Sequence, residues 1–321
     1  MRPADDLRSW LLLDLNRWVL TAAVLVGLFV VLAGLGTLDP VPLREAVSDS
    51  DPVETLFQAL LTAIVTGVTL VVTINQLVLS QELGAVGDQR ERMEGATAFR
   101  ADAAAAMDEP TAPADPAAFL RALVEATGER ADALAASVGP ETDDRARRAI
   151  TAYADDLGRA AEDASARLSG ERFGSFDVLR AALAFRYGPR LHEARRLRGA
   201  HDLGPETADA LGEVAETLSL FGPAREHVKT LYFQWELIDL SRAVLYAAVP
   251  ALAVTVSMLL FASDAGSITG TVLGVDALLL TVTAATAVGL LPFALLFSYI
   301  LRVATAAKRT LAIGPFVLRD R

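Results

Sequence analysis

Four long runs of uncharged, mostly apolar residues divide the chain. They cover residues 18–38, 56–78, 243–263 and 277–301. At a rise of about 1.5 Å per residue, a helix of roughly 20 residues crosses the hydrocarbon core of a membrane. The pattern therefore predicts an all-α integral membrane protein with four transmembrane helices in two hairpins, 18–80 and 243–301. Prolines at 250 and 292 are expected to kink the third and fourth spans.

The segment between the hairpins, residues 81–242, has the composition of a helical domain. It is rich in Ala, Leu, Arg and Glu, which favour helices, and it is divided by Gly and Pro. The expected breaks are residues 109–116, Gly139-Pro140, Gly170, Gly188-Pro189, Gly204-Pro205 and Gly222-Pro223. Since no further break precedes Pro250, we expect one helix to run from Pro223 into the third span.

The distribution of basic residues predicts the orientation. The segments that connect the two helices of each hairpin, 39–55 and 264–276, hold one basic residue between them, Arg44. Lys and Arg are retained on the cytoplasmic side, so we expect a multi-pass protein of the cell membrane with both termini in the cytoplasm. Its cytoplasmic parts would be an interfacial helix within 1–17, the helical domain 81–242 and a tail 302–321. A cleaved signal peptide is the alternative for the first span, but the apolar run is longer than such peptides use.

The second span is polar along one side. The polar residues are three or four positions apart, which at about 100° per residue confines them to an arc of roughly 80°. This polar stripe consists of Gln58, Thr62, Thr66, Thr69, Thr73 and Gln76. Copies of the helix around one axis would line a pore with groups that replace part of an ion's hydration shell. The alternative is a packing seam, in which the threonines bond to their own backbone or to a neighbouring helix.

Two further groups of charged residues have both a functional and a structural interpretation. Asp51 and Glu54 precede the polar stripe and would form an acidic ring at the outer mouth of a pore, but the order Asp51-Pro52 also predicts a helix cap, which we favour. The densest basic run would bind anionic lipid or a phosphate-bearing ligand, or would form ion pairs inside an acidic domain. It consists of Arg186, Arg190, Arg195, Arg196 and Arg198.

The chain is strongly acidic. The net charge is −11, and residues 81–242 contain 29 acidic and 20 basic side chains. The basic residues of the chain are 27 Arg and two Lys, a balance that resembles proteins of salt-accumulating halophilic archaea. An acidic surface in such proteins is an adaptation of solvation, so it does not by itself indicate a cationic ligand.

Several function classes find no support in the sequence. Cysteine is absent and the three histidines are scattered, so we expect no disulfide, thiolate nucleophile, metal site or cofactor. There is no H-E-x-x-H, P-loop or G-x-S-x-G motif, which argues against an enzyme. No aromatic residues alternate with the arginines, which argues against nucleic acid as a partner.

The order of the segments is similar to the layout of bestrophin-type anion channels, which are rings of subunits lined by their second span. The resemblance is one of layout alone, because that family has bulky apolar and aromatic residues where this chain has Thr62, Thr66 and Thr69, and no functional residue is transferred. The stretches INQLVLSQELG (74–84) and KRTLAIGPF (308–316) resemble uncharacterised haloarchaeal four-span membrane proteins.

Two functional hypotheses follow. The first is a homo-oligomeric ion channel or pore-like protein in the lipid bilayer, lined by the polar stripe. The second is a membrane-anchored scaffold or sensor whose cytoplasmic helical domain binds a protein partner, with the stripe serving only to pack the second span.

Overall fold

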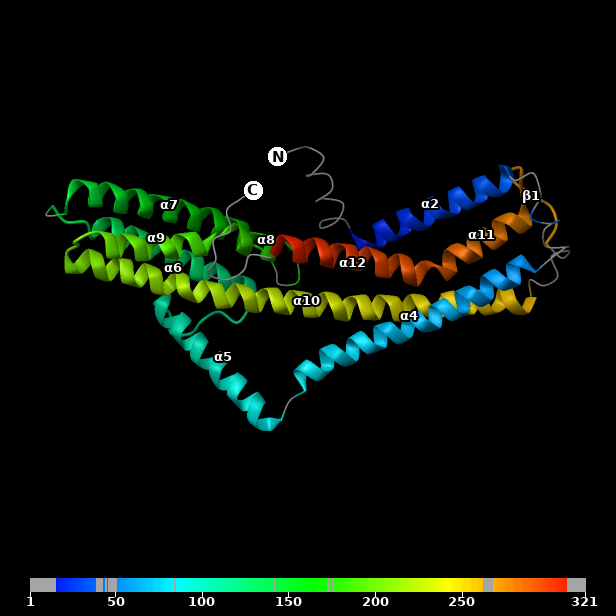
Figure 1. Ribbon diagram of the computed structural model, residues 1–321, viewed down its shortest axis with the longest axis horizontal. Coiled ribbons are helices and arrows are strands. Elements are labelled where there is room, and N and C mark those ends of the chain that lie inside the picture. The colour runs from blue at the N-terminus through cyan, green and yellow to red at the C-terminus, as the bar shows by residue number, and fades with distance from the viewer. Residues whose placement is uncertain are drawn as a thin grey trace. The chain divides into compact units, whose positions relative to one another are not determined.

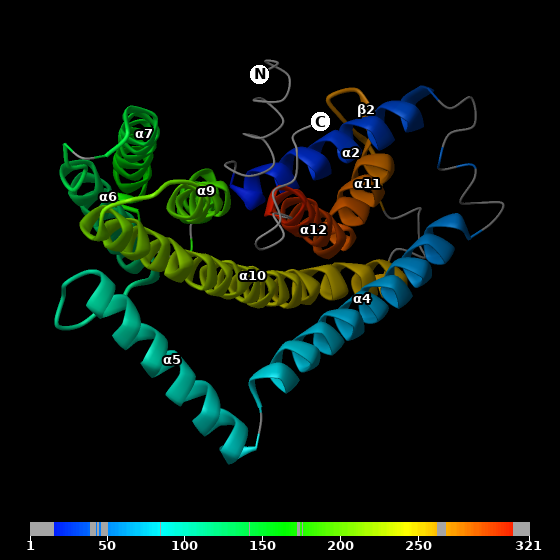
Figure 2. The same cartoon turned by 60° about the vertical axis from the view of Figure 1, so that its left-hand side comes forward.

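The computed structural model describes residues 16–38, 43, 45, 51–83, 85–140, 142–171, 174, 176–261 and 268–310 (Figures 1 and 2). These residues are helical except for short connections and one small β-hairpin. The chain divides into two units, which we describe separately. The apolar unit comprises the residues up to Leu83 together with Glu236–Lys308, and the acidic unit comprises Gly84–Trp235 and Arg309–Arg321.

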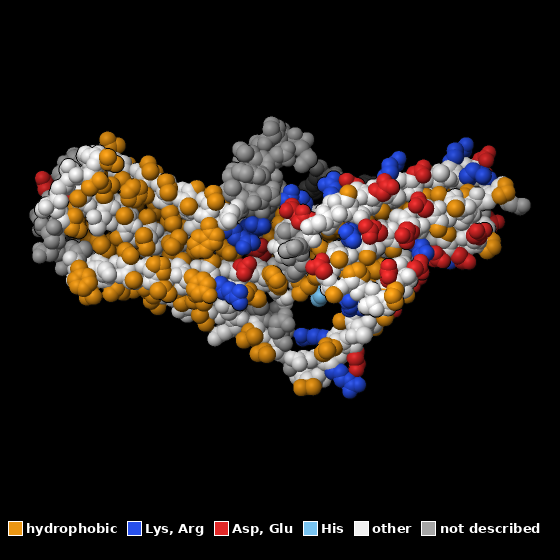
Figure 3. Space-filling view, turned by 180° about the vertical axis from the view of Figure 1, so that it is seen from behind, with side chains coloured by type: hydrophobic (Ala, Val, Ile, Leu, Met, Phe, Trp, Pro, Cys, Tyr) orange, Lys and Arg blue, Asp and Glu red, His pale blue; other side chains and the backbone are white. Residues whose placement is uncertain are grey.

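The helices of the apolar unit are long and poor in charge. They are α2 (Arg17–Leu38), α4 (Pro52–Glu82), the second part of α10 (Pro205–Phe261), α11 (Ala277–Gly289) and α12 (Leu291–Thr310). Three of them, α2, α4 and α10, are long and apolar enough to cross a membrane, and α11 with α12 makes a fourth candidate if the pair is one span. Figure 3 shows hydrophobic side chains covering this unit and acidic and basic ones gathered over the other. The helix expected within 1–17 and most of the tail 302–321 lie outside the described residues.

One face of α4 is buried inside the apolar unit. Its buried side chains are Val53, Phe57, Leu60, Ile64 and Val71. Their spacing of three, four and seven residues places them on one side of a helix. They pack on α11 near the start of α4, on α10 in its middle, and on α10 and α12 further along.

The last apolar segment is broken, as Pro292 predicts. The axes of α11 and α12 differ by 45°. Between them, the backbone N–H of Leu290 donates to the carbonyl of Thr286 at 2.9 Å, and its own carbonyl accepts from Phe293 and Ala294 at 3.1 and 3.0 Å. Leu290 therefore ends one helix and begins the next. Pro250, by contrast, does not interrupt α10.

The described part of the chain is all-α, as predicted, apart from a small two-stranded hairpin that precedes α11. Thr271–Val272 (β1) pairs with Val275–Asp276 (β2) in antiparallel register. The two residues between the strands, Leu273 and Gly274, have φ values of 54° and 82°, the positive values that a type I′ turn requires. The carboxylate of Asp276 then accepts from the backbone N–H of Leu278 at 2.7 Å and caps α11.

The acidic unit is a helical bundle. It contains α5 (Val86–Ala106), α6 (Pro116–Ala136), α7 (Asp144–Leu168), α8 (Phe176–Ala184), α9 (Tyr187–Ala200) and the first part of α10. A single hydrophobic core joins α6 to α10, with Leu120, Ile150 and Phe221 fully buried. The last two turns of α5 join this core, while its first turns diverge from the other helices (Figures 1 and 2).

Five of the predicted breaks lie between two helices of this unit or in the first turn of a helix. The predicted break at Gly222-Pro223 is wrong. Helix α10 begins at Pro205 and continues through Pro223. Gly222 lies against the ring of Tyr187, and Phe221 and Ala224 beside it are buried. This packing offsets the hydrogen bond that a proline removes from a helix.

Candidate functional site

The polar stripe lies on the exposed side of α4. All six of its side chains are exposed, from Gln58 at one end to Gln76 at the other. At about 100° per residue, they lie opposite the buried face that contains Phe57, Ile64 and Val71. Among the described residues of the apolar unit, no other helix covers the stripe.

Each threonine of the stripe donates its hydroxyl proton to the backbone carbonyl one turn earlier. The donors and acceptors are Thr62 and Gln58 (3.0 Å), Thr66 and Thr62 (2.8 Å), Thr69 and Val65 (2.9 Å), and Thr73 and Thr69 (2.9 Å). A hydroxyl has one proton and two lone pairs. Because the proton points back to the helix, the outward side of each oxygen offers lone pairs, which suit water or a cation.

The acidic residues at the start of α4 differ in their roles. Asp51 occupies the N-cap position and Pro52 begins the helix, as predicted, but the side chain of Asp51 makes no capping hydrogen bond. The carboxylate of Glu54 accepts from the side-chain amide of Gln58 at 2.9 Å. Both Asp51 and Glu54 are exposed. Glu54 therefore extends the polar stripe by one turn with a negative charge.

A second polar group in the apolar unit was missed by the sequence analysis. Arg17 forms an ion pair with Glu236 and donates to the hydroxyl of Tyr299 at 3.3 Å, and Arg302 lies 3.9 Å from the same Glu236 carboxylate. Arg17 and Arg302 were visible as charges at the ends of apolar runs, but nothing in the sequence pairs them with a glutamate so far away along the chain. Nearby, Ser241 of α10 donates to the amide oxygen of Asn75 at 2.7 Å, which ties α10 to α4 outside the arc of the stripe.

The basic run lies along α9, and the structure distributes its members around that helix. Arg190 pairs with Asp156 at 3.3 Å, and Arg196 pairs with Glu193 at 2.5 Å. The hydrogen bond from Arg196 holds the pKa of Glu193 below its usual value and raises the pKa of Arg196. The ion-pair interpretation therefore applies to these two arginines. The other members are Arg186, Arg195 and Arg198, all exposed.

Neither unit presents a metal site among the described residues, since no three His, Asp or Glu side chains there lie close enough to hold an ion. A family model, for a family of unknown function, matches residues 2–321. No curated protein and no solved structure matches the chain.

Proposed function

The chain belongs to DUF7972, a family of unknown function, and we therefore propose its function from the arrangement of its own side chains. We propose that it is a homo-oligomeric membrane channel, in which copies of α4 surround a path lined by the polar stripe and by Glu54. The observation that carries this proposal is the exposure of the whole stripe on the side of α4 opposite its buried face.

Insertion into a membrane is supported by the surface of the apolar unit. Large apolar side chains are exposed on several of its helices, including Val26 and Val30 on α2 and Leu70 on α4. In water such a surface would be strongly unfavourable, whereas lipid would cover it. Three or four of the helices have the required length and composition.

Assembly is supported by the cost of leaving the stripe in lipid. The threonines already bond to their own backbone, so hydrocarbon would penalise them little. The side-chain amides of Gln58 and Gln76 have more donors and acceptors than a single neighbour satisfies, and exposing them to hydrocarbon is costly. A ring of α4 helices would bring these amides into water and leave the apolar sides of the helices to lipid.

Selectivity for cations follows from the chemistry of the same face. The threonine oxygens present lone pairs outward, Glu54 adds a carboxylate, and α4 contains no Lys or Arg. Such a lining attracts cations and repels anions. This is the reverse of the selectivity that the bestrophin-like layout alone would suggest.

A scaffold or sensor is the second candidate, because the back-bonded threonines can also rest in lipid without any pore. Oligomeric state separates the two candidates. A monomer or dimer, measured by light scattering in several mild detergents and by crosslinking in native membranes, would provide too few copies of α4 to enclose a path. That result would exclude the channel.

The direct test is the water accessibility of the stripe. Since the chain has no cysteine, Thr66→Cys and Thr69→Cys each create a single thiol. Leu70→Cys is the matched control: Leu70 is 58% exposed and adjacent to Thr69, but it lies off the stripe. Gly67→Cys is a second control, because a side chain there meets Phe293.

We expect a water-soluble cationic thiol reagent, applied to sealed vesicles at molar salt, to label positions 66 and 69 at least tenfold faster than position 70. In reconstituted bilayers the same modification of Thr66→Cys should block a cation-selective current. Equal, slow labelling of positions 66, 69 and 70 would show that the stripe faces lipid or protein, and the channel would be abandoned.

A further inference from the structure

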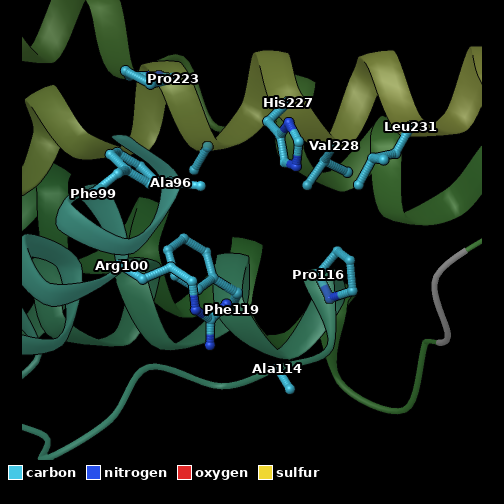
Figure 4. Close-up of a pocket in the computed structure, with 11 residues that line it drawn as sticks. Ala96, Phe99, Arg100, Ala114, Pro116, Phe119, Pro223, His227, Val228 and Leu231 are labelled. Atoms are coloured by element: carbon cyan, nitrogen blue, oxygen red, sulfur yellow. The ribbon is translucent and has the colours of Figure 1, made fainter. Parts of the chain in front are cut away.

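The acidic unit contains a cavity of about 400 Å³ between α5, the start of α6 and the middle of α10 (Figure 4). The side chains that define it are Phe99, Arg100, Pro116, Phe119, His227 and Leu231. All of them belong to one unit, and the volume is within the range of small-molecule sites.

The walls of the cavity are apolar and partly aromatic. The rings of Phe99 and Phe119 are 6.1 Å apart and inclined by 36°. Pro116 from the start of α6 and Val228 and Leu231 from α10 complete the walls. The flat or short apolar part of a small ligand would displace water from these walls. Burial of apolar surface in this way is the main source of affinity in such sites.

Two polar side chains line the cavity, and both favour an anion. Arg100 is held in place because it donates to the backbone carbonyls of Ala112 and Pro113 at 2.7 and 3.1 Å. Its charge is not neutralised by a carboxylate among the described residues, whereas Arg90, Arg130 and Arg190 of the same unit form ion pairs. His227 projects from α10 toward the cavity in Figure 4.

The lining contains no Asp or Glu, even though residues 81–242 contain 29 of them. An acidic domain that excludes carboxylates from its cavity, and places there a fixed guanidinium, has the charge complementarity of an anion site. We propose that this cavity binds a small apolar carboxylate, with its apolar body between Phe99 and Phe119 and its carboxylate attracted to Arg100 and His227. The proposal does not depend on ion conduction.

The test is photolabelling of the full-length protein in detergent with 4-benzoylbenzoate, an aromatic carboxylate, followed by mass spectrometry of peptides. We expect the label within 96–119 and 223–231. We also expect 1-naphthoate to compete at concentrations at least tenfold lower than 1-naphthamide, its uncharged analogue. Labelling spread over the hydrophobic helices, or equal competition by the two compounds, would overturn the proposal.

Variants make the test specific to the cavity. His227→Gln and Arg100→Gln should each reduce labelling about tenfold, since each removes a partner of the carboxylate. Arg90→Gln removes the same charge from α5 outside the cavity and should have no effect. Ala96→Trp should fill the cavity and abolish labelling, while Ala98→Trp, two residues further along α5 and on its opposite side, should not. Unchanged labelling in both His227→Gln and Ala96→Trp would refute the site.

Discussion

Arg17, the first residue of α2, is paired with the buried carboxylate of Glu236 on α10, 219 residues further along the chain. The guanidinium also lies 4.6 Å from the ring centroid of Tyr299 on α12. Glu236 is only 3% exposed. Glu236 therefore links α10 to α2 through Arg17 and to α12 through Arg302.

Replacing this glutamate should destabilise the protein strongly. Glu236→Gln removes the negative charge that both Arg17 and Arg302 approach, and breaking a buried pair in this way costs about 3 kcal/mol. We expect the melting midpoint in detergent to fall by several degrees. Asp239→Asn is the control, because Asp239 is half exposed and lies 3.9 Å from Arg17. Similar midpoints for the two variants would contradict the role assigned to Glu236.

Gly222 and Gly158 should respond in opposite ways to alanine. A Cβ at Gly222 would lie 2.8 Å from the hydroxyl of Tyr187, while a Cβ at Gly158 in α7 meets nothing within 4 Å. Overpacking should make Gly222→Ala less stable by about 1–3 kcal/mol. Gly158→Ala should gain up to about 1 kcal/mol from helix propensity. Thermal melts followed by circular dichroism would decide, and a gain in both variants would show that Tyr187 yields without cost.

Glu226 should contribute stability that is lost in acid. Burial alone would raise the pKa of Glu226, but hydrogen bonds from Lys229 and Arg225 outweigh it and hold the pKa below the usual 4.5. Because the pKa is lower in the folded state, the contribution is complete above the unfolded pKa and disappears as the pH falls through the folded one.

The corresponding measurement is the difference in melting midpoint between the wild type and Glu226→Gln as a function of pH. Glu226 is 40% exposed, so at pH 7 the variant should be less stable by under about 1 kcal/mol. The difference should shrink toward zero as the pH falls below about 4.5 and through the lower pKa of the folded state. Lys229→Gln should show the same trend. A difference independent of pH would mean that Glu226 acts only through packing.

Low salt should loosen the acidic unit. Its carboxylates outnumber its basic groups, and at 0.1 M salt the repulsion between them is screened only beyond about 10 Å. We expect the melting midpoint to rise between dilute and molar KCl. The triple variant Glu129→Gln, Asp132→Asn, Glu162→Gln neutralises acidic side chains that line one groove between α6 and α7, and should reduce the slope. A midpoint indifferent to salt would refute the prediction.

Local periodicity predicted the parts of the fold that depend on single helices. The spacing of polar residues from Gln58 to Gln76 identified one face of α4, and Pro292 marked the break between α11 and α12. Predictions from Gly and Pro alone were wrong where packing determines the structure. Gly222-Pro223 continues a helix because Tyr187 and the core surround it. The segment before α11 forms a hairpin around Leu273 and Gly274.

Contacts between segments that are far apart along the chain could not be predicted from the sequence. The Arg17–Glu236 pair and the cavity at Phe99 and His227 join residues more than a hundred positions apart, and neither leaves a periodic signal. Whether the stripe faces water depends in addition on other copies of the chain, so it stays a prediction that the cysteine variants test.

The break at Leu290 makes the joint between α11 and α12 easier to bend than the helices on either side of it. In an intact helix, bending stretches several hydrogen bonds at once, but Pro292 has no N–H to contribute and Leu290 already divides its bonds between two helices. A change of angle between α11 and α12 then requires rotation about a few backbone torsions and leaves the hydrogen bonds of each half intact. Because α4 packs on both halves, a rotation at Leu290 would change the packing along the buried face of α4.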